Sequence, residues 1–413
     1  MPNTFAKVTW VTMESLRRLL NRLEVAKYFY TGYNKEYNRP FAVGETIQPK
    51  LPQRWLIRDG MTWTPQDIDR RTTSITMQAP FGVDFAWNSV EKLLDMERGE
   101  EMVRKEYIDP AIDQIAQEID SRCALWAYLH TPNIAGLLGT TPTTLQYFHQ
   151  ARAQLVERAC PGGDWGMIIS PQMHATLGTN LTAILNPQKE ISDLFRKGLL
   201  GNAAGFKWHE SMSLYTHTAG TMTAADVTVS VAATNGATSI VLASAAIGAT
   251  LLKGDVISFT TPNAVNPSTR RTTGRTMTVV LTQNCTIGAA GTATAYFTPA
   301  LYGPGSPYQN VDALPAAGNV VVLFPGTTLP SGLVGVQGLA MQEMAFALVS
   351  GTFEEPKAVE VASTKLDPET GISISFIRQF EARTRTYINR LDCMIGFGDL
   401  YNENAAVRVQ SLV

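Results

Sequence analysis

The chain has 413 residues, which at roughly 150 residues per domain corresponds to two or three domains. With 45% hydrophobic residues it can bury a substantial core, which argues against a disordered chain. Its 34 Lys and Arg and 36 Asp and Glu give a formal charge of -2, and only 17% of the residues are charged. This balance argues against a dedicated DNA-binding protein but leaves room for a local basic lining.

The cysteines and the first residues bear on the cellular compartment. Cys123, Cys160, Cys285 and Cys393 are too far apart for a redox CxxC pair or for half of a zinc site, so we expect free thiols. The first twenty residues have no apolar signal region, and no apolar run is long enough to span a membrane. We therefore expect a chain that is made and kept in a reducing cytoplasm.

The N-terminal part of the sequence predicts two segments without a core of their own. Apolar residues at helical spacing predict an amphipathic helix over Met13–Tyr30. The next segment, Gly44–Met77, combines short apolar pieces around Trp55 and Trp63 with several turn residues, which predicts an extended two-stranded excursion. Because an isolated hairpin is marginally stable in water, both segments imply a partner, and self-association is the simplest one.

A long helix follows, from Ser89 to about His130, with isoleucines recurring on one face. Pro110 lies inside this pattern and either bends the helix or marks a new start. Farther on, helical patterns alternate with a short buried strand at Trp165–Ser170, which indicates a small α/β core.

Residues 222–307 have a different composition from the rest of the chain and are rich in Thr, Ala, Gly and Val. Only six residues of Thr221–Asn310 are charged, and turns are expected at Asn235-Gly236 and at Lys253-Gly254-Asp255. Regularly spaced short strands predict an antiparallel barrel or sandwich, inserted into a host domain that resumes after it. The expected strands are Asp226–Val231, Ser239–Leu242, Asp255–Thr260, Arg275–Leu281 and Thr292–Phe297.

The C-terminal part is strongly β in character. Gly371–Asp392 reads as one long strand-forming run, and Asp392–Tyr401 as a closing strand. Arginines are spaced along the run, and they fit inter-strand or inter-subunit ion pairs better than phosphate contacts.

A search for catalytic chemistry finds no candidate. The sequence lacks an HExxH pair, a GxSxG elbow and a phosphate-binding glycine loop, and its carboxylate pairs lie in solvated segments. His209 and His217 are interpreted as ordinary surface or turn histidines. We therefore predict that the protein is not an enzyme and uses no cofactor or metal.

The order of these parts resembles that of a tailed-bacteriophage major capsid protein with the HK97-type fold. The resemblance is greatest to the P-22-like coat proteins, which carry an inserted β domain. It spans nearly the whole chain in order. The stretches that carry it are Met13–Tyr30, Gly44–Met77, Met102–Leu129, GNAAGFKWHESMSLYTHTAGT at Gly201–Thr221, LLKGDVISF at Leu251–Phe259 and Gly371–Tyr401.

The resemblance implies an α+β fold with a peripheral (P), an axial (A) and an inserted (I) domain. The implied division is an N-terminal arm at 1–40, an extended loop at 41–80, the spine helix with the P domain and first part of the A domain at 81–221, the inserted domain at 222–307, and the rest of the A domain with P-domain strands at 308–413. A low-charge insertion of this kind is expected to stabilise the subunit itself or a contact between capsomers.

The implied function is assembly into hexamers and pentamers of an icosahedral shell around double-stranded DNA. Implied partners are further copies of the chain, a scaffolding protein, a portal and a decoration protein, with weak non-specific DNA contacts and no membrane. Assembly would take place in the host bacterial cytoplasm, and the final location would be the virion capsid. Some relatives cross-link a loop lysine to an asparagine; Lys50 is the only lysine of Gly44–Met77, and we expect no such cross-link.

Five residues are predicted to lie at subunit interfaces: Trp55, Arg58, Trp63, Arg383 and Arg385. For the two tryptophans the argument is their apolar bulk on a loop without a core. Two alternatives to a phage capsid remain, an encapsulin-like nanocompartment shell and a β-rich phage tail protein. A nanocompartment would share the core and arm without such an insertion, whereas a tail protein would not explain the long helix and the arms.

Overall fold

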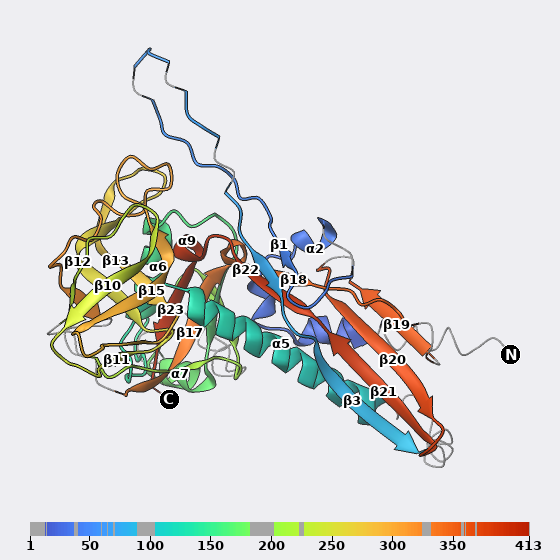
Figure 1. Ribbon diagram of the computed structural model, residues 1–413. Coiled ribbons are helices and arrows are strands. Elements are labelled where there is room, and N and C mark those ends of the chain that lie inside the picture. The colour runs from blue at the N-terminus through green and yellow to red at the C-terminus, as the bar shows by residue number, and fades with distance from the viewer. Residues whose placement is uncertain are drawn as a thin grey trace. The chain divides into compact units, whose positions relative to one another are not determined.

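The computed structural model describes residues 13, 15–36, 40–58, 60–63, 65–68, 71–88, 104–181, 202–222, 227–323, 332–356, 359, 361–367 and 370–412 (Figure 1). These residues form an α+β protein rich in β-sheet, in agreement with the expected class. The chain divides into two compact units, each assembled from separated stretches. The first unit comprises 1–51, 72–123 and 346–400, and the second comprises 52–71, 124–345 and 401–413.

The first unit begins with a helix that is shorter than expected. Residues 15–22 are helical, and after a break the chain makes a single 3-10 turn, η1 (Ala26–Tyr28). The carboxylate of Asp120 accepts hydrogen bonds from the backbone N–H groups of residues 24, 25 and 26, at 2.7, 3.1 and 3.0 Å. These amides are therefore bound to a distant side chain instead of a preceding helical turn, and the prediction of one helix through Tyr30 is wrong.

The same segment is packed into the first unit. The ring of Phe29 stacks on Phe346 with centroids 5.4 Å apart and meets Phe397 edge-on at 6.1 Å. The guanidinium of Arg18 pairs with Asp109 at 2.8 Å and with Asp113 at 3.0 Å. The prediction of an arm without a core is thus wrong for residues 15–30, because they share the core of their own chain; residues 1–12 lie outside the described part.

The buried carboxyl of Asp120 gives the first unit a specific pH dependence. Desolvation raises the pKa of Asp120 from 3.8 to about 6, against the opposing effect of its three N–H donors. Since the folded state holds this proton more tightly than the unfolded state, the contribution to the unfolding free energy falls as pH rises from about 4 to about 6. The expected change is on the order of 3 kcal/mol, at about 1.4 kcal/mol per unit of pKa shift.

This expectation can be checked by urea unfolding of the unassembled subunit between pH 4 and pH 7. Asp120→Asn cannot ionise, so the difference in unfolding free energy between wild type and variant should decline across that window and stay constant above it. A difference that is the same at every pH would contradict the assignment.

The β strands of the first unit form two four-stranded antiparallel sheets. In sheet order these are β1-β2-β22-β18 and β19-β20-β21-β3. The bounds are β1 Thr46–Ile47, β2 Ile75–Met77, β3 Phe81–Asn88, β18 Phe346–Ser350, β19 Val361–Leu366, β20 Ser373–Glu381, β21 Thr386–Cys393 and β22 Ile395–Asp399.

The predicted single run Gly371–Asp392 is in fact a hairpin. It turns at residues 382–385, between β20 and β21, where Arg385 has a φ of 53°. No Gly, Pro or Asn occupies these four positions, so the sequence carries no turn signal there. The expected closing strand is confirmed as β22.

Of the predicted long helix, the structure describes residues 104–130. A π-helical turn, η2 (Arg104–Ile108), leads into α5 (Asp109–His130), and a short helix, α2 (Tyr33–Glu36), lies earlier in the chain. Pro110 is the second residue of α5, so it marks a new start. Residues 89–103, where the helix was also expected, lie outside the described part.

The second unit contains the host sheet of the inserted module. Its strands have the order β4-β23-β17-β5-β7-β6, with β8 paired to β17. Helix α6 (Gln146–Glu157) packs on β4 and β23, and the other helical elements are α7 (Pro171–Leu181), η4 (Glu343–Ala345) and α9 (Asn402–Ala405). The strands are β4 Ile134–Ala135, β5 Trp165–Ile169, β6 Asn202–Ala203, β7 Phe206–Glu210, β8 Thr216–Thr218, β17 Val334–Gln342 and β23 Ala406–Gln410.

The inserted module is a small barrel. Its strands are β9 Val227–Val229, β10 Ala237–Ser244, β11 Thr250–Leu251, β12 Val256–Val265, β13 Thr272–Leu281, β14 Cys285–Thr286, β15 Thr292–Leu301 and β16 Val321–Leu323. Six of them form a sheet of order β16-β12-β13-β15-β10-β9, and a bridge between Thr228 and Val320 joins its two ends. This nearly closed sheet encloses its own apolar core. All five predicted strands are present, and β16 extends the module beyond the expected end at 307.

Candidate assembly surface

The extended loop was predicted as a long hairpin over Gly44–Met77, and its strand pairing proves to be confined to the base. There β1 and β2 pair at Thr46–Thr76 and Ile47–Ile75, and an isolated bridge joins Lys50 to Thr72. Beyond that bridge, the described residues of 51–68 form no strand, and the loop is drawn as a plain blue trace (Figure 1). The expected two-stranded character is therefore correct only for its first few residues.

Two glutamine side chains hold the limbs of the loop together where strand pairing has ended. The amide of Gln66 accepts a hydrogen bond from the backbone N–H of Leu56 at 2.8 Å and donates one to the carbonyl oxygen of Leu56 at 2.7 Å. Nearer the base, Gln53 donates to the carbonyl oxygen of Asp67 at 3.0 Å. A side-chain amide thus replaces the backbone amide of a missing strand partner, which satisfies polar groups of an otherwise unpaired loop.

The loop exposes an unusual amount of apolar side chain. Five large apolar residues are more than half exposed, from 54% at Trp55 to 100% at Met61, and the other three are Ile57, Trp63 and Ile68. Scattered exposed apolar residues are normal on a protein surface, but five within one short segment mark a candidate interaction surface.

The residues predicted for interfaces lie on two segments. Trp55, Arg58 and Trp63 are exposed on the extended loop, in the second unit, while Arg383 and Arg385 are exposed in the β20–β21 turn of the first unit. All five are accessible to a partner, as the prediction requires.

Farther along the hairpin, Arg390 pairs with Asp392 at 2.6 Å and lies 3.7 Å from Asp84 on the neighbouring strand β3. The inter-strand interpretation of the arginine series is therefore correct for Arg390.

The inserted module contacts the base of the loop. Arg270, in the turn between β12 and β13, donates from its guanidinium to the carbonyl oxygens of Trp55 and Pro307, both at 3.3 Å. On the other limb, the guanidinium of Arg71 lies 5.2 Å from the ring centroid of Tyr308. A cleft of about 560 Å³ lies between the loop base and this turn, lined by Trp55 and Arg270 among others. Sequence reasoning had assigned Arg270 no such role.

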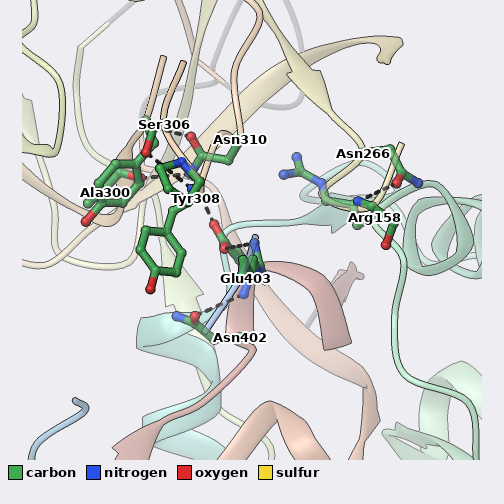
Figure 2. Close-up of polar contacts among 12 residues, drawn as sticks. Arg158, Asn266, Ala300, Ser306, Tyr308, Asn310, Asn402 and Glu403 are labelled. Carbon is green, nitrogen blue, oxygen red and sulfur yellow. Dashed lines mark hydrogen bonds and ion pairs between the residues drawn. The ribbon is translucent and has the colours of Figure 1, made fainter. Parts of the chain in front are cut away.

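A buried carboxylate, Glu403 of α9, gathers polar groups from several parts of the second unit (Figure 2). Asn310 of the module donates to its Oε2 at 3.1 Å, and Arg54 of the extended loop lies 3.9 Å from its Oε1. Asn310 also donates to the carbonyl oxygen of Ala300 at 2.8 Å, which fixes its orientation. Glu403 therefore links the module, the loop base and the end of the host sheet.

A second charge in this region, Arg158, is buried just after helix α6. Desolvation lowers the pKa of Arg158 to about 10, while the negative charge of Glu403 acts in the opposite direction. One buried carboxylate thus partly compensates a buried guanidinium, which is the usual condition for keeping such a charge inside a protein.

His217 is part of a buried network and not a surface residue. The Tyr128 hydroxyl is hydrogen-bonded to its Nδ1, and its Nε2 lies 2.8 Å from a carboxylate oxygen of Asp255. The Asp255 carboxylate also accepts hydrogen bonds from the backbone N–H groups of Leu252 and Gly220, at 2.7 and 3.2 Å. The interpretation of His217 as an ordinary surface or turn histidine is wrong, because helix α5, strand β8 and the module close over it.

The neighbouring Arg408, on β23, is also buried. Its guanidinium donates to the carbonyl oxygen of Gly254 at 3.0 Å and lies 5.1 Å from the Tyr128 ring centroid. Desolvation lowers the pKa of Arg408 to about 10 and raises that of Tyr128 above its usual value. A relay of Tyr, His and Asp can move protons in an open site, but these three side chains are closed off from solvent. The arrangement serves as a polar joint between module and host.

The described residues contain no group of three or more His, Cys, Asp or Glu side chains placed to hold a metal ion. Their four cysteines are free thiols, and three of them are buried. Within the same residues, no helix combines the length and apolar character required to cross a membrane.

Comparison with known proteins gives structural neighbours only. No protein-family model and no curated protein matches the chain. Among solved structures, the capsid of Ralstonia phage GP4 is 11% identical over 94% of this chain and 90% of its own, with a TM-score of 0.45. The capsid of the cyanophage P-SCSP1u is 12% identical over 90% and 85%, with a TM-score of 0.41.

A shorter match covers one part of the chain. The CUS-3 coat protein I-domain is 22% identical over 24% of this chain and 95% of its own, with a TM-score of 0.18. The solved structures similar to this chain therefore include phage capsids and a coat-protein domain.

Proposed function

We propose that the protein is a phage major capsid protein, a structural subunit that associates with copies of itself into a closed shell. The observation that carries the proposal is the extended loop, whose described residues include five large apolar side chains more than half exposed and show no strand pairing beyond the base. Such a loop cannot bury its apolar surface within itself, and docking on a neighbouring copy removes that surface from water. The proposal places the chain in the same class as the capsids to which it is similar.

The order of parts supports the finer assignment to the HK97-type fold with an inserted domain. In this proposal α5 is the spine helix, the first unit corresponds to the P domain, and the second unit corresponds to the A domain with the barrel as the inserted domain. The five-part division stated from the sequence is retained, with the inserted domain extended to residue 323 because β16 belongs to its sheet. We retain the closer relation to P-22-like coat proteins on the basis of that insertion.

The partners follow from the same proposal. Copies of the chain form hexamers and pentamers, and a scaffolding protein and a portal take part in their assembly. The shell encloses double-stranded DNA, and the low overall charge fits weak, non-specific DNA contacts. Many weak contacts repeated over a closed lattice make such a particle stable without a strong pairwise interface.

Electron microscopy of the full-length protein tests the proposal. The protein is expressed alone and together with the product of a neighbouring scaffold gene. Closed shells, or sheets and tubes of capsomers, are expected in at least one condition, and their lattice gives the arrangement of copies. A monomer that persists in both conditions contradicts the proposal and favours a tail or binding protein. Uniform shells that retain a cargo protein instead of DNA indicate a nanocompartment.

Denaturing gels of mature particles should show single subunits and no cross-linked ladder.

A further inference from the structure

We propose that the inserted barrel positions the extended loop of its own chain, with Arg270 as the positioning residue. This inference rests on the proposed function, because it concerns how the assembly loop is held before a neighbour binds. It starts from the contacts between the loop base and the module, which are all made within the second compact unit.

The turn that carries Arg270 is itself fixed on the host domain. The side-chain oxygen of Asn266 accepts hydrogen bonds from the backbone N–H groups of Ser268 and Thr269, at 2.9 and 3.0 Å. Its side-chain amide donates to the carbonyl oxygen of Glu157, the last residue of α6, at 2.7 Å (Figure 2). The turn is therefore anchored to the end of a host helix, and Arg270 projects from an anchored support.

Arg270 uses this support to hold two chain segments at once. Its backbone has a φ of 56°, a left-handed conformation that an arginine adopts at a cost in free energy. From there its guanidinium binds the carbonyl oxygens of Trp55 in the loop and Pro307 in the module. One planar donor group thus ties the first limb of the loop to the barrel.

The loop is also held at two further points. Arg54 approaches the buried Glu403 at 3.9 Å, on the same limb as Trp55. Arg71 lies over the ring of Tyr308 on the other limb, and Tyr308 belongs to the same module segment as Pro307. Both limbs are therefore anchored, at Trp55 and at Arg71, and the part between them carries four of the five exposed apolar side chains.

The physical consequence is preorganisation. The loop residues that the structure describes form no strand beyond the base, so a loop without further support would lose much conformational entropy on docking. Anchoring both limbs on the barrel removes part of that loss before the neighbouring copy arrives, and this favours association. The module then serves assembly by restricting the loop, in addition to forming its own core.

Hydrogen–deuterium exchange of the unassembled full-length subunit tests the inference. In Arg270→Ala, the peptide containing the Leu56 amide, which is bound to Gln66 in the wild type, should exchange about tenfold faster. The matched control is Arg271→Ala, at the exposed neighbouring position, which should exchange like wild type in this peptide. Barrel amides of β12 and β13 should stay protected in both variants, which establishes that the module is folded.

Arg270→Lys serves as a second variant that keeps the charge but not the planar fork, and it should also loosen the loop. Unchanged exchange at Leu56 in both Arg270 variants, with the barrel intact, would overturn the inference. Because exchange is measured before assembly, the result is independent of shell formation. If the Arg270 variants exchange faster at Leu56 but the wild-type chain never forms shells, the inference about the loop stands and only the capsid proposal is refuted.

Discussion

Replacing both Trp55 and Trp63 by alanine is expected to leave a folded, soluble subunit that forms few closed shells. Both side chains are more than half exposed, so their removal takes little from the core of the subunit. At an interface, however, truncating a buried tryptophan typically costs about 2 kcal/mol or more. Two such losses at every loop amount to about 4 kcal/mol, so the subunit concentration needed for assembly should rise on the order of a thousandfold, measured by sedimentation and electron microscopy.

The control for this double variant removes apolar surface elsewhere. Val231→Ala with Ile247→Ala takes two exposed apolar side chains from the barrel and should leave assembly unchanged if the loop is the docking element. Trp55 also lines the cleft beside Arg270, so Trp63→Ala alone separates docking from any effect on the loop base. Wild-type shell yields from both tryptophan variants would exclude the loop as an anchor.

Asp255→Ala is expected to be the most destabilising single substitution in the second unit. The change removes the acceptor of His217 and of the Leu252 and Gly220 amides; the His217 and Gly220 contacts are buried and the Leu252 contact is partly buried. It also removes a negative charge that stabilises the buried guanidinium of Arg408. Deleting one partner of a buried charged network typically costs about 3–5 kcal/mol, since the remaining groups cannot reach water.

Urea unfolding of the unassembled subunit measures this effect. Asp164→Ala, which removes an exposed ion pair with Lys207, is the control and should cost less than about 1 kcal/mol. If Asp255→Ala gives too little folded protein, Asp255→Asn keeps an acceptor oxygen without the charge and should show a smaller loss. Equal stability of Asp255→Ala and Asp164→Ala would show that the joint does not hold module and host together.

Prediction from the sequence succeeded where the signal is local. The five barrel strands were found because short apolar alternation, a near absence of charge and turn residues such as Asn235-Gly236 occur together within a few residues. Pro110, the second residue of α5, was recognisable as either a bend or a new start for the same reason, because a proline acts on its own turn of helix.

Prediction failed where a distant residue decides the local conformation. The N-terminal helix ends because Asp120, far along the chain, accepts hydrogen bonds from three backbone amides that follow the helix. No residue near the helix end indicates this in the sequence. The β20–β21 turn lacks turn-forming residues, so pairing of the two strands along their length fixes it.

The candidate site shows the same division. Exposure of Trp55 and Trp63 could be predicted, because a short segment without a helical or strand period has nowhere to bury them. The residues that contact the loop, Gln66, Arg270 and Glu403, could not be predicted. They are ordinary polar residues in the sequence, and only their contacts in the folded chain distinguish them.

By itself, the sequence determined the α+β class, the inserted barrel and the apolar loop, because composition and residue periodicity depend only on neighbours in the chain. The tertiary structure alone decided that the N-terminal segment is packed, that His217 is buried and that Arg270 of the barrel contacts the loop. Each of these depends on contacts between residues far apart in the sequence, and such pairings form only when the folded chain brings the two groups together.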